Sequence, residues 1–146
     1  MVAVLTKKAM SIACIAIIGK ANNPLYLRNF STSHPDLKYH YIAHTACDAV
    51  DERASATQKS GDPYLGLLYT VEDLAIYGYM TNTRIKFIVV VSVAENIVKD
   101  TEMRSIFKKI HAAYIGLVSN PFYDPDTTRT IQSAKFHKWI DSIIVT

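Results

Sequence analysis

Two histidines and a carboxylate recur at helical spacing in the first third of the chain, and no other pattern in it is as well suited to chemistry. His40, His44 and Asp48 are four residues apart, so they share one side of a helix, as metal ligands can. A hydrolytic zinc helix has glutamate directly after its first histidine, where this chain has Tyr41, and the sequence has no second histidine pair. We therefore favour a solvated helix face, with a metal-dependent enzyme as the alternative.

The sequence offers no other catalytic pattern. Its five glycines are dispersed, so neither a phosphate-binding loop nor a dinucleotide fingerprint can be built. No serine stands in a nucleophile-elbow context. Cys14 and Cys47 fall on predicted core positions, which is typical of small buried hydrophobes and not of a reactive thiol. The sequence therefore predicts no catalytic residue, no bound metal and no cofactor, and the two lone thiols favour a reducing compartment.

The charge pattern of the chain is weak. The formal net charge is +3, but lysine and arginine are scattered along the sequence. No window contains the run of like charges that marks a nucleic-acid or lipid-binding tail. With 146 residues, 49% of them apolar, the chain is long enough for one domain with its own core. We expect no nucleic-acid partner.

The N-terminal region admits two interpretations. Lys7 and Lys8 precede an apolar run over residues 12–18, as they would in a signal peptide. That run is far shorter than the roughly 20 residues of a membrane span, and turn-forming residues follow it. We therefore favour a buried first strand, with residues 1–9 as a poorly packed extension and residues 10–146 as a single domain.

Hydrophobic periodicity divides the chain into strands and helices. Strands are predicted over residues 12–18, 25–30, 64–69, 74–80 and 85–91, and helices over 35–56, from 100 to about 118, and from 133 onward. The order β-β-α-β-β-β-α-α indicates an α/β (α+β) domain. Its simplest packing is a five-stranded antiparallel sheet, with the first helix on one face and the last two on the other. The strand over 85–91 is apolar on both sides and therefore needs cover on both.

Two large apolar residues interrupt the polar side of the first predicted helix. Leu37 and Tyr41 lie there beside His44 and Asp48. A tyrosine among polar groups is typical of protein interfaces, whereas a covering loop would explain it equally well. Tyr123, which ends the segment Asn-Pro-Phe-Tyr after the second helix, is a further candidate for an aromatic interface anchor.

Several segments, taken together, resemble one known family. They are residues 10–19 with Asn23-Pro24-Leu25-Tyr26, Ile42-Ala43-His44 with Asp48, Leu65-Gly66-Leu67-Leu68-Tyr69, and Asn120-Pro121-Phe122-Tyr123. From Met10 on, the chain is similar to the sedlin family of the trafficking protein particle (TRAPP) complex, and within it more to the subunit 2-like branch than to sedlin itself. The extension over residues 1–9 departs from the family pattern, as does Thr70, where these proteins commonly have proline.

The resemblance implies a longin-like (SNARE-like) domain, in agreement with the element order, and a subunit without catalytic residues. It implies an adaptor or scaffold role in a complex that tethers vesicles and promotes nucleotide exchange on Rab GTPases, in traffic from the endoplasmic reticulum to and within the Golgi. The implied partners are other small core subunits and larger peripheral subunits, with Rab GTPases reached indirectly and membranes only through the complex. The expected location is the cytoplasm, peripherally on Golgi and endoplasmic reticulum membranes.

In that role the candidate interface residues are Leu37, Tyr41, His44, Asp48 and Tyr123. A second class of function stays open, namely a free-standing longin-type regulator that binds SNARE or adaptor proteins. Such a regulator would have a peptide groove between sheet and helix and would circulate alone.

Overall fold

The computed structural model describes residues 12–19, 23–30, 35–56, 64–71, 74–81, 83–92, 100–120 and 134–145. Within these residues the elements are β1 (Ile12–Ile18), β2 (Pro24–Asn29), α2 (Asp36–Ala56), β3 (Tyr64–Val71), β4 (Leu74–Met80), β5 (Lys86–Ser92), α3 (Asp100–Val118) and α4 (Ala134–Val145). The predicted order and type of every element are confirmed. The observed ends of the elements differ from the predicted ones by one or two residues. The largest difference is at β3, which continues to Val71 instead of ending at Tyr69. Residues 1–9 lie outside the described residues.

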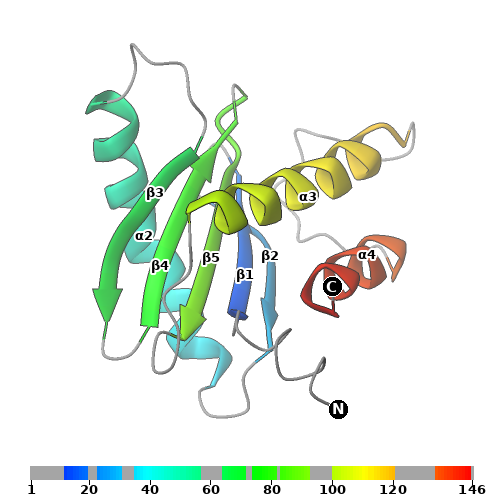
Figure 1. Ribbon diagram of the computed structural model, residues 1–146, viewed down its shortest axis with the longest axis horizontal. Helices are drawn as coiled ribbons and strands as arrows, with labels where there is room; N and C mark the ends of the chain where they lie inside the picture. Colours follow the sequence, from blue (N-terminus) through cyan, green and yellow to red (C-terminus); the bar gives the residue numbers. More distant parts are fainter. Residues whose placement is uncertain are drawn as a thin grey trace.

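The five strands form one antiparallel sheet in the order β2-β1-β5-β4-β3 (Figure 1). β1 lies inside this sheet, paired on one side with β2 and on the other with β5. All seven of its residues are buried, which fits its continuous apolar sequence. The interpretation of residues 12–18 as a strand is therefore confirmed.

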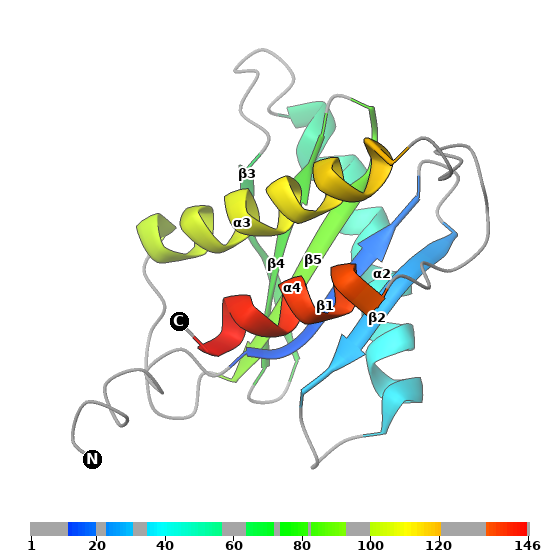
Figure 2. The same ribbon diagram turned by 90° about the vertical axis from the view of Figure 1, so that its right-hand side faces the viewer.

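The helices cover the sheet from both sides, as predicted. Figure 2 shows α3 and α4 in front of the sheet and α2 behind it. β5 supplies both layers of core, because Phe87 and Val89 pack with Met103 of α3 on one face, while Ile88 and Val90 pack with the α2 face. This division follows the alternation of side chains along a strand.

α2 is fixed on its face of the sheet by small buried residues and by hydrogen bonds. Ala43 and Ala46 are buried against the strands, which lets the helix lie close. The hydroxyl of Tyr69 donates a hydrogen bond of 2.9 Å to the carbonyl of Ile42, and Arg53 donates one of 3.1 Å to the carbonyl of Leu65. These contacts with β3 fix which side of α2 faces outward.

Candidate protein-interaction site

The outward side of α2 carries a continuous stripe of four side chains. Leu37, Tyr41, His44 and Asp48 are spaced by four, three and four residues, which places them on one line along the helix. At 1.5 Å per residue the stripe is about 16 Å long. It lies opposite the side of α2 that is buried on the sheet, to which Tyr39, Ile42, Ala46 and Val50 belong. The structure thus brings together four of the five predicted interface residues, whereas Tyr123 lies outside the described residues.

The two apolar members of the stripe are open to solvent. The exposed fraction is 77% for Leu37 and 72% for Tyr41, the highest among the large hydrophobic side chains described. Among the described residues, no element covers these two side chains, so they are open to contact from outside. His44 and Asp48 are exposed as well.

The stripe changes in character along its length. Its N-terminal half is apolar and aromatic, whereas Asp48, Asp51 and Glu52 make the C-terminal half of α2 acidic. Asp51 is drawn toward the sheet, with its Oδ1 atom 3.6 Å from Nζ of Lys86. Asp48 and Glu52 are exposed and remain accessible to a basic group of a partner.

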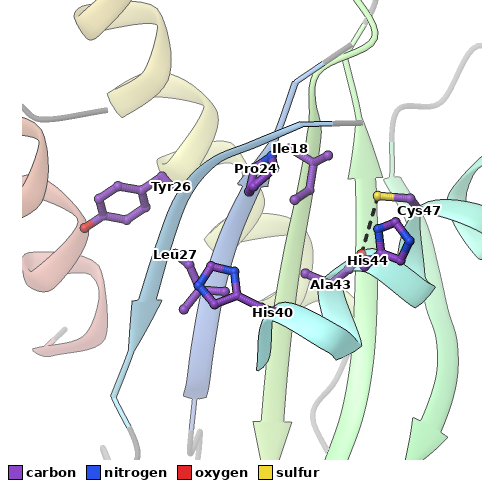
Figure 3. Close-up of a pocket in the computed structure, with 8 residues that line it drawn as sticks. All are labelled: Ile18, Pro24, Tyr26, Leu27, His40, Ala43, His44 and Cys47. Carbon is purple, nitrogen blue, oxygen red and sulfur yellow. Dashed lines mark hydrogen bonds between the residues drawn. The ribbon is translucent and has the colours of Figure 1, made fainter. Parts of the chain in front are cut away.

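A groove of about 170 Å³ borders the stripe, between α2 and the strands β1 and β2 (Figure 3). Its apolar lining comes from Ile18, Pro24, Leu27, Ala43 and Cys47, and its polar groups are the imidazoles of His40 and His44. Tyr26 also contributes to the lining, but its ring points away toward α4 (Figure 3). A volume of this size suits one large apolar side chain, with imidazole N–H and N atoms at hand for hydrogen bonds.

His40, His44 and Asp48 do not form a metal centre. Among the described residues, no three His, Cys, Asp or Glu side chains are grouped closely enough to hold a metal ion. Cys47, close to both histidines in sequence, donates its thiol hydrogen to the carbonyl of Ala43, 3.4 Å away. Burial raises the pKa of the Cys47 thiol, and the nearby Lys86 ammonium offsets this only in part, so the group stays protonated.

Sequence reasoning found the stripe, but it expected a groove between sheet and helix only for the alternative regulator and did not identify the residues that line it. The stripe belongs to a single helix, so its spacing is visible in the sequence. The groove joins His40 to Pro24 and Leu27, and only the packing of α2 beside the edge strand β2 brings these residues together. No local pattern could have predicted it.

Comparison with known proteins gives the family of this chain. The family model described as Sedlin matches residues 17–145. The chain belongs to the sedlin family. It is 44% identical over 136 residues to the trafficking protein particle complex subunit 2-like protein of Rattus norvegicus, covering 90% of this chain and 96% of that protein. The protein of the same name from Dictyostelium discoideum is 42% identical over 137 residues, with 91% and 96% covered.

Membership of the sedlin family agrees with the architecture. The five-stranded antiparallel sheet with α2 on one face and α3 and α4 on the other is the longin-like arrangement predicted from the sequence. In the parts of the chain that the structure describes, no helix combines the length and apolarity needed to cross a membrane.

Proposed function

We propose that this chain is a non-catalytic adaptor subunit of the trafficking protein particle complex, which binds its neighbours through the outer stripe of α2. The observation that carries the proposal is the similarity, over nearly their whole length, to relatives named as subunit 2-like proteins of that complex. On this proposal the chain contributes protein contacts to a tethering and Rab nucleotide-exchange assembly in endoplasmic reticulum-to-Golgi and intra-Golgi transport. It works in the cytoplasm, peripherally at those membranes, with the other small core subunits and larger peripheral subunits as partners and Rab GTPases reached indirectly. Residues 10–146 act as one domain.

The chemistry of the stripe supports a contact with another protein. Tyrosine and leucine on a helix face supply apolar area at little cost in conformational entropy, and tyrosine is enriched among the residues that dominate interface energetics. Leu37 and Tyr41 are therefore the anchors, and Asp48 is the charged group that fixes orientation by pairing with a basic residue of the partner. Tyr123, which lies outside the described residues, stays a further candidate for an aromatic anchor.

The decisive experiment is affinity purification of the tagged chain from its own cells, followed by gel filtration and mass spectrometry. The wild-type chain should elute in a large particle with other small trafficking subunits. Asp48→Ala should weaken the association by about 2–5 kcal/mol, or at least roughly 30-fold, because the partner's basic group would be left without its carboxylate. Glu102→Ala is the matched control, since it removes an exposed carboxylate from α3, on the opposite face of the sheet.

Two outcomes would count against this proposal. If the wild-type chain elutes as a lone monomer, the adaptor role is wrong. If Asp48→Ala co-purifies with the particle as tightly as Glu102→Ala, the chain can still be a subunit but the outer stripe of α2 is not its interface.

The groove beside α2 supports one rival function. A free-standing longin-type regulator would hold an apolar side chain of a SNARE or adaptor peptide between His40, His44 and Leu27. His40→Ala, which removes an exposed imidazole from the lining of the groove, should then weaken peptide binding while Asp48→Ala leaves it intact. This rival function requires that the wild-type chain elute as a monomer. The same result would contradict the adaptor role.

A further inference from the structure

Charge is unevenly distributed between the described helices on the two faces of the sheet. In α2, the exposed charged residues are the carboxylates Asp48, Asp51 and Glu52, whereas the cations Lys38 and Arg53 are only partly exposed. On the other side, the exposed charged residues of α3 and α4 are mainly cations, namely Arg104, Lys108, Lys109, Lys135 and Lys138. The carboxylates of α3 lie in its first turn, and Asp141 of α4 is held by Arg28 at 3.0 Å. The middle of α3, from Arg104 to Lys109, and the N-terminal half of α4 are therefore basic.

Four lysines form the core of this surface. Lys108 and Lys109 stand in the middle of α3, and Lys135 and Lys138 stand in the first turns of α4. All four are exposed, and none has an ion-pair partner within the part of the chain that the structure describes. The two helices lie side by side on the same face of the sheet (Figure 2). Because all four lysines are exposed on these neighbouring helices, we place them on one surface.

Two large apolar side chains stand exposed among these lysines. The exposed fraction is 50% for Ile115 of α3 and 41% for Trp139 of α4. Trp139 lies over Gly116, where an added Cβ atom would come within 2.8 Å of the indole ring. The glycine thus lets the indole rest on α3 with much of its surface still in solvent. Lys108, Lys109, Ile115, Lys135, Lys138 and Trp139 are called here the basic helical face.

A groove of about 350 Å³ runs between the two helices beside this indole. Leu117 and Phe136 give it an apolar floor, while Lys135 and Asn120 contribute polar groups. An apolar floor with a lysine and an exposed indole in its lining is a combination that suits the boundary between lipid headgroups and acyl chains.

We propose that the basic helical face binds an anionic membrane surface directly. The lysines would attract phosphatidylserine or phosphoinositide headgroups, and Trp139 and Ile115 would enter the headgroup region between them. An acidic protein is the other chemistry that such charge could meet. The lipid surface is favoured because the cations are spread over the outer sides of two helices around exposed apolar groups, as on interfacial amphipathic helices. This inference goes beyond the adaptor role and does not depend on it, because the purified chain alone should bind the membrane surface through this face.

The single tryptophan of the chain makes the test direct, because all tryptophan fluorescence comes from Trp139. The purified full-length chain is titrated at physiological salt with phosphatidylcholine vesicles and with vesicles that contain about one third phosphatidylserine. Anionic vesicles should shift the emission to shorter wavelength and protect Trp139 from iodide, whereas neutral vesicles should do neither. Lys135→Glu/Lys138→Glu should lower the affinity at least about 25-fold, at roughly fivefold for each cation lost near the surface.

Lys38→Glu/Arg84→Glu is the matched control, since it changes the net charge by the same amount outside α3 and α4. It should bind anionic vesicles nearly as well as the wild-type chain, and thermal melts should show that both variants are folded. The proposal is overturned if folded wild-type chain does not bind anionic vesicles, or if the two double variants bind equally. It is also overturned if vesicles leave the emission of Trp139 unchanged while an acidic polypeptide shifts it, because the face would then be a protein-binding one.

Discussion

At the scale of single residues, the least expected feature is a lysine under α2. Lys86, the first residue of β5, is only 3% exposed, yet its Nζ atom lies 3.6 Å from the half-exposed carboxylate of Asp51. It occupies the same side of the strand as Ile88 and Val90, where the sequence pattern calls for apolar side chains. The ion pair therefore joins the C-terminal half of α2 to the sheet and helps to set the direction in which the stripe faces.

Asp51→Ala should destabilise the fold, because it removes a carboxylate partner from a buried ammonium group. The expected loss in the free energy of unfolding is about 1–2 kcal/mol, less than the roughly 3–5 of a fully buried pair, since Asp51 is half exposed. Urea unfolding measures this. Asp48→Ala, on the exposed stripe, should cost about 0.5 kcal/mol or less. Equal stability of the Asp51→Ala and wild-type chains would mean that the ion pair contributes nothing.

Two tyrosines, one buried and one partly buried, predict how the fold responds to alkaline pH. Burial is the main reason why the pKa of Tyr26 and that of Tyr69 rise from 10.0 to about 12, with smaller contributions from Asp141 and Tyr41 respectively. Each group has a higher pKa in the folded than in the unfolded chain, so its contribution to stability is complete below pH 10 and is lost as the pH rises toward 12.

The free energy of unfolding should therefore fall between pH 10 and pH 12. Tyr26→Phe/Tyr69→Phe should make that fall shallower, although the lost hydrogen bonds cost about 1 kcal/mol each at neutral pH. Urea unfolding at several alkaline pH values gives the profile. A double variant with the same slope as the wild-type chain would contradict the assignment of these tyrosines.

At the scale of elements, α4 is attached to the sheet by a core contact and by a cluster of polar interactions around that contact. Its inner side is apolar, with Phe136 in edge-on contact with the ring of Tyr26 on β2, the two ring centres 5.1 Å apart. Around this contact, Tyr26 and His137 are hydrogen-bonded at 2.9 Å and Arg28 pairs with Asp141 at 3.0 Å. These interactions attach α4 to the edge strand of the sheet.

The packing of Phe136 in the core should contribute more to the stability of the attachment of α4 than the ion pair of Asp141 does. Phe136→Ala should cost about 3–5 kcal/mol, because a fully buried aromatic side chain is lost. Asp141→Ala should cost about 0.5–1 kcal/mol, because both partners of its ion pair are more than one third exposed. Hydrogen exchange of the α4 amides measures both effects, and similar protection in the two variants would contradict this order.

The sequence alone was enough to predict the strands and helices and one part of the candidate site, the outer stripe of α2. Alternating apolar residues in β5 and the apolar stripe of α3 repeat at the period of their own structure, so local pattern predicts them. The outer stripe of α2 was predictable for the same reason. Lys86 beneath α2, the contact of Tyr26 with His137, and the groove at Leu27 were not, because each joins residues that only the packing of separate elements brings together.

At the scale of the whole molecule, the sheet separates two surfaces of opposite character. The net charge of +3 suggests little, because the cations are scattered along the sequence. Folding collects Lys108, Lys109, Lys135 and Lys138 on one side and leaves Asp48 and Glu52 on the other. A partner bound at α2 would thus leave the basic helical face free, and a membrane bound at α3 and α4 would leave the stripe free.

This separation predicts that the two activities can be lost independently. Asp48→Ala should weaken co-purification with the complex but leave vesicle binding by the purified chain unchanged, and Lys135→Glu/Lys138→Glu should do the reverse. The physical reason is that the two sets of substitutions lie on opposite faces of the sheet and share no described contact, and effects of such distant changes are usually additive. Combining all three substitutions should lower each activity only as far as its own variant does. A combined variant that loses vesicle binding beyond the lysine variant would show instead that the two faces are coupled through the sheet, and Asp51, whose ion pair with Lys86 joins α2 to β5, would be the first residue to test for that coupling.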